Sequence, residues 1–274
     1  MKLTRIDLNS WLLEIAGLRV LIDPWLVDPL VFYGQPWLFS ASHLKPPVYN
    51  PATLPKIDLI LISQGLDDHC HKPTLEQLDR QIPVLGSPTA ATIVKSLGYT
   101  TVLSLTPGQT DTFGALSITA VTGAPIQGQV ENGYFLKDLE SGGTVYYEPH
   151  WFQSEQVTAQ FQGTVDVAIA PIIGQVFPLL GQVIMGSTEA MHLIQTLRPR
   201  IFVPTALGEI EARGILPMLI RSIGSVEEFS DRLAASGSKT ELLLPAAGET
   251  LELQLGSREQ LSATDDSDYL FSRE

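Results

Sequence analysis

Short apolar runs, separated by glycine, proline and polar residues, recur along the whole chain. Near the N-terminus, residues 10–15 and 18–22 form two such runs, and the alanine-glycine pair between them predicts a hairpin. Residues 57–62 form a third run, whose continuous apolarity is typical of a strand buried on both faces. Residues 73–78 follow it and predict a helix with proline in its first turn.

Predicted strands and helices share the rest of the chain. Strands are expected at residues 83–86, 101–105, 111–113, 116–122, 133–137, 144–147, 165–170, 201–203, 241–244 and 250–253. Helices are expected at residues 88–97, 155–161, 188–197, 216–222 and 226–235. Ser187 is the expected cap of the helix at 188–197, because a serine side chain can accept a hydrogen bond from the first turn.

Two apolar segments interrupt this pattern and predict long loops. Residues 25–55 are rich in proline and aromatic side chains, and residues 172–185 are punctuated by glycine and proline. Long loops inside a compact domain are usually functional. No composition shift marks a domain linker, so we expect one domain over residues 1–256, followed by a polar, acidic tail over residues 257–274.

Composition narrows the class of protein. Of 274 residues, 44% are hydrophobic and 17% are charged, which is enough apolar material for a substantial core. The formal net charge of −13 argues against nucleic acid or an anionic membrane surface as a direct partner. Residues 1–7 predict no signal peptide, and no apolar run approaches the roughly 18 residues of a membrane span. The single cysteine, Cys70, predicts a cytoplasmic protein or one of another reducing soluble compartment.

Carboxylates and imidazoles gather in the turn after residues 57–62. Asp68 and His69 stand next to each other there, which suits a metal ligand pair or an acid–base pair. His71 is an equally good candidate for a ligand or for a solvated residue at the start of a helix. Asp67 is expected to cap a helix or to form a hydrogen bond rather than to bind a metal. Gln64 is a further candidate in this turn.

A second group follows the strand at 144–147. His150 is a candidate site residue, with Glu148 two positions before it. His192 lies within a predicted amphipathic helix and His43 within the first long loop, so both are expected to be structural. No cysteine-histidine spacing of a zinc finger, glycine-rich phosphate loop or nucleophile elbow is present.

Five segments in order resemble the metallo-β-lactamase fold superfamily, in particular its UlaG-like branch of zinc-dependent hydrolases. They are residues 18–25, ending in Asp-Pro-Trp; 58–69, where the family has His-x-His-x-Asp-His; 145–150, 200–206 and 245–251. The resemblance covers nearly the whole chain and implies an α/β fold, a four-layer αββα sandwich.

The family's metal motif is only partly retained. Gln64 and Leu66 stand at its two leading histidine positions, and Ala206 stands at the last one. No histidine occurs in residues 123–127, where the family has its middle histidine. Asp68 and His69 keep the last two positions of the motif. His150 stands where the family has the aspartate that bridges the two metals.

The resemblance therefore implies loss of the first metal site and survival of the second. Asp68, His69 and His150 would hold one zinc ion, with Glu148 as a fourth ligand or as the base. In that interpretation Asp68, His69 and Glu148 are the catalytic residues, and Gln64, Asp67 and His71 are additional candidates.

Two functions stay open at this point. One is a hydrolase with at most one metal that activates water on a small, lipophilic ester, lactone or phosphoester. The alternative is a metal-free descendant, which is a small-molecule binding protein or an Asp-His acid–base catalyst. The apolar segments at 25–49 and 172–185 form either a lid over the site or an interface, so homo-oligomerisation is left open.

Overall fold

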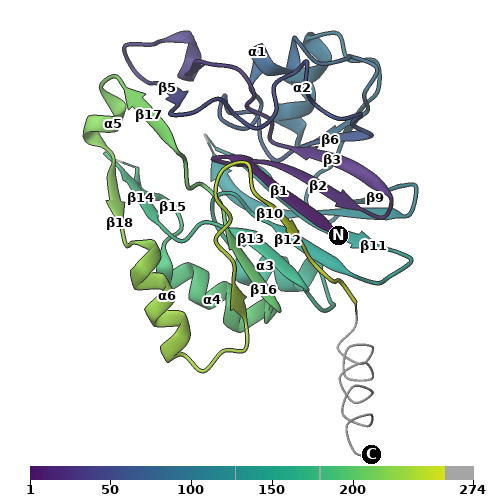
Figure 1. Cartoon of the computed structure of the whole chain (residues 1–274), viewed down its shortest axis with the longest axis vertical. Coiled ribbons are helices and arrows are strands. Elements are labelled where there is room, and N and C mark those ends of the chain that lie inside the picture. The colour runs from purple at the N-terminus through teal and green to yellow at the C-terminus, as the bar shows by residue number, and fades with distance from the viewer. Residues whose placement is uncertain (127, 179, 257–274) are drawn as a thin grey trace, which may run out of the picture.

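The computed structural model describes residues 1–126, 128–178 and 180–256 (Figure 1). The predicted tail at 257–274 lies outside the described residues, so the domain boundaries remain a prediction. Within the described part, most strands form two sheets that face each other, and helices cover their outer faces. The predicted α/β, four-layer αββα sandwich is confirmed.

The first sheet is mixed and has the order β20-β1-β2-β3-β6-β7-β8 in the described residues. Its strands are β1 (Lys2–Asp7), β2 (Ser10–Ile15), β3 (Leu18–Ile22), β6 (Leu59–Ile62), β7 (Val84–Gly86), β8 (Val102–Ser104) and β20 (Thr250–Glu252). β3, β6, β7 and β8 run parallel, so the loops that follow β3 and β6 emerge at the same edge of this sheet.

The second sheet has the order β19-β16-β13-β12-β11-β10-β9 in the described residues. Its strands are β9 (Thr110–Phe113), β10 (Leu116–Ile126), β11 (Gln129–Asp138), β12 (Thr144–Tyr147), β13 (Val167–Ala170), β16 (Ile201–Pro204) and β19 (Glu241–Leu242). β12, β13, β16 and β19 are parallel neighbours.

The central strands of each sheet are buried on both faces, which explains their apolar runs. Along β12, Val145 and Tyr147 point into the core between the sheets, whereas Tyr146 packs with the helices outside. The outer layers are α1 (Lys72–Leu75) and α2 (Pro88–Ser96) on the first sheet, and α3 (Ser154–Gln160), α4 (Ser187–Leu197) and α6 (Val226–Ala235) on the second.

Both segments predicted as long loops contain strands. Residues 172–185 form the hairpin of β14 (Gly174–Phe177) and β15 (Gly181–Ile184), which pairs with β18 (Arg221–Ile223). Residues 25–55 contain β4 (Leu30–Val31), the 3-10 turn η1 (Phe32–Gly34) and β5 (Ser40–His43), which pairs with β17 (Ile210–Arg213). The loop predictions were wrong there, because these short strands combine a local pairing, β14 with β15 or β4 with β5, with a pairing to β18 or β17 far along the chain.

Two helix predictions also need correction. The helix expected at 216–222 is the single turn α5 (Leu216–Leu219) followed by β18, since residues 221–223 extend the small sheet. The helix α4 includes Ser187, so this residue is not its cap. Gly186 occupies that position, and the Glu189 carboxylate accepts a hydrogen bond from the Gly186 amide at 2.9 Å.

Among the described residues, no helix is both long and apolar enough to cross a bilayer.

The thiol of Cys70 offers a direct test of the packing around the loop after β6. Cys70 is fully buried, and burial raises the pKa of its thiol to about 12. We expect no reaction of the native protein with a thiol-specific disulfide reagent at pH 8, followed by reaction of one thiol per chain on unfolding in guanidinium. Rapid labelling under native conditions would contradict the packing of α1 against the first sheet.

Candidate metal centre

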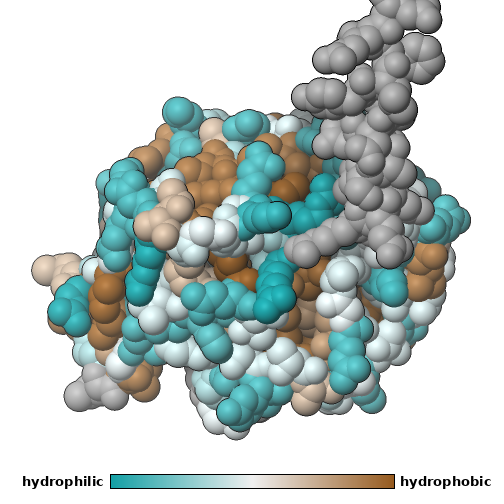
Figure 2. Space-filling model, turned by 90° about the horizontal axis from the view of Figure 1, so that it is seen from below, coloured by the Kyte–Doolittle hydropathy of each residue, from teal (hydrophilic) through white to brown (hydrophobic). Residues whose placement is uncertain are grey.

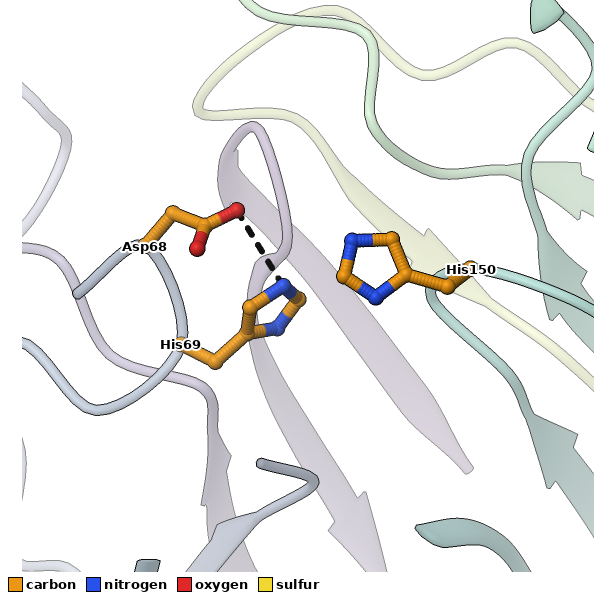
Figure 3. A group of neighbouring side chains, drawn as sticks. All are labelled: Asp68, His69 and His150. Atoms are coloured by element: carbon orange, nitrogen blue, oxygen red, sulfur yellow. Dashed lines mark ion pairs between the residues drawn. The ribbon is translucent and has the colours of Figure 1, made fainter. Parts of the chain in front are cut away.

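Asp68, His69 and His150 come together where the two sheets end. Asp68 and His69 lie in the loop after β6, and His150 follows β12 of the facing sheet. One ligand atom from each residue lies within 4.8 Å of the others, and Figure 3 shows the carboxylate and both rings turned toward one another. The ring centroids of the two histidines are 4.9 Å apart.

Four neighbouring side chains fix the ring of His69, which is fully buried. One of them is Ser63, whose hydroxyl lies 3.2 Å from His69 Nδ1. Its Nδ1 donates a hydrogen bond to Asp23 Oδ2 at 2.7 Å. Its Nε2 lies 3.2 Å from Asp68 Oδ2 and 3.5 Å from the Asn9 side-chain nitrogen. A ligand imidazole is usually held in this way, by a carboxylate on one ring nitrogen while the other faces the metal.

Asp23 was missed as a site residue by the sequence analysis. It follows β3 with a left-handed φ of 42° and is completely buried. Its carboxylate accepts hydrogen bonds from the Ser63 amide at 2.7 Å, the Ser63 hydroxyl at 2.6 Å and the Tyr147 hydroxyl at 2.6 Å. The Asp-Pro that ends the predicted strand was its signal, although no local pattern places Asp23 beside His69.

The two histidines have opposite electrostatic environments. Burial by itself would lower the pKa of His69, but the Asp68 and Asp23 carboxylates raise it to about 10. Burial and repulsion by His69 lower the pKa of His150 to about 3. Burial opposes ionisation of Asp68, yet His69 holds the pKa of this carboxyl below its usual value. In the absence of a metal, the cluster therefore consists of a protonated His69, an ionised Asp68 and a neutral His150.

Hydrogen bonds hold His150 from its side chain and from its backbone. The Gln64 side-chain nitrogen lies 2.5 Å from His150 Nδ1. Glu148 Oε1 accepts hydrogen bonds from the backbone amides of His150 at 2.9 Å and Trp151 at 3.0 Å. The His150 carbonyl accepts one from the Met185 amide at 2.8 Å, which joins the end of β15 to the site.

Glu148 is not a member of the three-residue group. Its Oε1 shapes the turn that carries His150, and its Oε2 is buried without a hydrogen-bond partner among the described residues. Burial raises the pKa of Glu148 to about 8. The predicted role of Glu148 as a fourth ligand or as the base stays a prediction.

The remaining candidates, Asp67 and His71, are not members of the three-residue group. Asp67 accepts a hydrogen bond from the Tyr33 backbone amide at 2.8 Å, so it ties η1 to the site loop. His71 is only 2% exposed, its Nδ1 lies 2.9 Å from the Thr74 hydroxyl, and burial lowers its pKa to about 4. The alternative of a solvated His71 was therefore wrong. His43 stacks on Trp25 with a centroid distance of 3.8 Å.

The donor set fits one divalent ion. A carboxylate and two imidazoles are three protein ligands, the number typical of a catalytic zinc site. Asp68 Oδ1 is buried and has no hydrogen-bond partner in the described structure, which is costly for a carboxylate unless another group satisfies it. Leu66 and Ala206 offer no ligating side chain at the other positions of the family motif.

Comparison with known proteins agrees with this fold. The family model of the beta-lactamase superfamily domain matches residues 2–206. A metal-dependent hydrolase of Pyrobaculum islandicum is 27% identical over 248 residues, which are 89% of this chain and 96% of the relative. The structure of an isothiocyanate hydrolase from Delia radicum gut bacteria has a TM-score of 0.68 at 18% identity, covering 93% of this chain and 100% of that one. A metallo hydrolase of Ignicoccus hospitalis has a TM-score of 0.61 at 18% identity, covering 92% and 99%.

The hydrogen bond from Tyr147 to Asp23 should contribute more to stability than a matched bond to a neutral group. Tyr134 is equally buried, and its hydroxyl donates to the Ile62 carbonyl at 3.0 Å and accepts from the Asn132 side-chain amide at 3.0 Å, so both of its partners are neutral. We expect Tyr147→Phe to lower the free energy of unfolding by about 1.5–3 kcal/mol and Tyr134→Phe by about 0.5–1.5 kcal/mol, because the first bond has a charged acceptor. Urea titrations of both variants measure this difference, and equal losses would contradict it.

Proposed function

The chain belongs to the beta-lactamase superfamily, and from this we propose that it is a metal-dependent hydrolase with one metal ion held by Asp68, His69 and His150. The convergence of these three side chains carries the proposal. The names of relatives such as the Pyrobaculum islandicum metal-dependent hydrolase support the reaction class. Zinc is the preferred ion, because imidazole with carboxylate is a common ligand set for it.

The chemistry divides between the ion and the chain. A bound zinc ion supplies Lewis acidity and makes water a nucleophile near neutral pH. Asp23 fixes the ring of His69, so that Nε2 faces Asp68 and the centre of the cluster. Glu148, with a pKa of about 8, would exchange a proton near neutral pH and is the proposed base.

A single ion is proposed because the partners of a second ion are missing. Gln64, Leu66 and Ala206 replace histidines of the family motif, and leucine and alanine have no ligating atom. Gln64 makes its close contact with His150. The three proposed ligands, Asp68, His69 and His150, correspond to the second metal position of the family motif.

The proposed substrate is a small, lipophilic ester, lactone or phosphoester. Both apolar segments are joined to the site, one through Tyr33 and Asp67 and the other through Met185 and His150. These segments expose large apolar side chains, with Trp37 at 61% and Leu180 at 74% exposure. Attachment at the site favours a rim or lid, and an interface between copies of the chain stays the alternative.

One observation favours a second candidate function. Without a metal, the protonated His69 lies between Asp68 at 3.2 Å and Asp23 at 2.7 Å. A buried imidazolium paired with Asp68 can donate a proton, so a metal-free small-molecule binding protein or an Asp-His acid–base catalyst is the alternative. Assignment to the UlaG-like branch and to a reducing compartment are further proposals, supported by the sequence motifs and by Cys70 as the single cysteine.

Metal content distinguishes the two functions. Protein purified without chelator and supplemented with zinc should hold about one ion per chain by elemental analysis, because three ligands converge. His69→Ala and His150→Ala should each lose it. His192→Ala is the matched control, since His192 is exposed on α4 and should leave the content unchanged. If the wild-type protein holds no metal with any supplement, the metal centre is refuted and the metal-free function is retained.

Hydrolysis should follow the metal. We expect the zinc-loaded protein to cleave a chromogenic short-chain ester, lactone or phosphodiester, and we expect a chelator to abolish turnover and zinc to restore it. His69→Ala should reduce kcat/KM at least a hundred-fold, because it removes one of the three proposed metal ligands. Turnover that survives both the chelator and His69→Ala would refute the metal-dependent mechanism.

A further inference from the structure

Gln64 is the most informative neighbour of the cluster that the proposed mechanism does not use. Its side chain is 1% exposed, and its amide nitrogen lies 2.5 Å from His150 Nδ1. Its Oε1 is buried without a hydrogen-bond partner among the described residues. A buried amide this close to an imidazole is part of the site. Its oxygen atom makes no hydrogen bond when the amide nitrogen faces Nδ1.

Gln64 contacts one of the two ring nitrogens of His150. In Figure 3 the ring nitrogen farther from the backbone, Nε2, is on the side of Asp68 and His69. Nδ1 is the atom in contact with Gln64. His69 has the same division, with Nδ1 bonded to Asp23 and Nε2 facing Asp68. Both imidazoles therefore have a protein partner at Nδ1 and present Nε2 to the centre of the cluster.

The orientation of the Gln64 amide decides what His150 can do. A half-turn about the last side-chain bond exchanges the amide nitrogen and oxygen at nearly the same positions. If the NH₂ group faces Nδ1, Nδ1 must accept, the proton of the neutral ring is on Nε2, and Nε2 cannot bind a metal. If Oε1 faces Nδ1, Nδ1–H donates to it and the lone pair of Nε2 points toward Asp68 and His69.

We propose that Gln64 is a positioning residue that accepts the Nδ1–H of His150 through Oε1 and thereby keeps Nε2 as a metal ligand. This inference rests on the proposed function for the identity of the ligand, but the tautomer of His150 can be measured without a metal. It also connects two departures from the family motif. A histidine at position 150 needs an acceptor behind its ring, and glutamine at position 64 supplies it.

Nitrogen-15 NMR of histidine-labelled full-length protein tests the tautomer directly. In the metal-free protein we expect His150 as the neutral Nδ1–H form. Gln64→Met keeps the length of the side chain but removes the acceptor, so the signal should shift toward the Nε2–H form. Gln77→Met, at an exposed glutamine, is the matched control and should leave the His150 signals unchanged. An Nε2–H form in the wild type, or no change in Gln64→Met, would overturn the proposal.

Zinc competition titrations add a second measurement. Gln64→Met should weaken zinc binding about 10–100-fold, which is the usual effect of removing a residue that orients a ligand. Gln64→Glu restores an acceptor and should bind zinc within a few-fold of the wild type. If Gln64→Met does not fold, the wild-type tautomer and the affinity of Gln64→Glu still decide the question.

The outcomes separate this inference from the proposed function. Wild-type protein that binds no metal, but whose His150 tautomer depends on Gln64, would refute the metal centre and retain the role of Gln64. Protein that binds one zinc ion with the same affinity and the same His150 tautomer in Gln64→Met would retain the metal centre and refute the role of Gln64.

Discussion

The buried carboxylate of Asp23 is the constraint on which the site depends. A carboxylate inside an apolar sandwich is tolerated only when it is paired and hydrogen-bonded. Its partners come from separate places: Ser63 at the end of β6, His69 in the loop beyond it, and Tyr147 on the facing sheet. The need to satisfy one charge thus joins both sheets where the ligands converge and leaves His69 one orientation of its ring.

The same charge shapes the electrostatics of the centre. His69 lies between two carboxylates, so without a metal it carries a proton that compensates them. A divalent ion bound at Nε2 would replace that proton and neutralise Asp68 more completely. The neighbouring His150 is kept neutral by burial and by His69, which is the form a ligand requires. A site that lacks four histidines of the family motif therefore keeps a charge arrangement suited to one cation.

The sandwich positions the proposed ligand residues, whereas the two small sheets beside the site control which substrates can reach it. The three proposed ligands follow β6 and β12, strands whose ends are fixed by the core. The small sheets β15-β14-β18 and β17-β5-β4 are attached to the site through Met185 and Asp67 and expose apolar side chains. Since one fold supports many reactions, substrate choice is a property of these segments and of the ligand loops.

The sequence by itself determined the layers and the adjacency of Asp68 and His69. Apolar runs such as residues 57–62 show which segments are buried on both faces, because burial leaves a local pattern, and residues 226–235 were predicted as the helix α6. Only the tertiary structure decided which distant residues meet. Asp23 and His69 touch because β3 and β6 are parallel neighbours, and Gln64 meets His150 because the sheets face each other. The strands β5 and β14 each lie in the middle of a small sheet, between a neighbour in the sequence and a strand far along the chain, β17 or β18. Hydrogen bonding to these distant strands adds order that the local pattern, which predicts a loop, does not show.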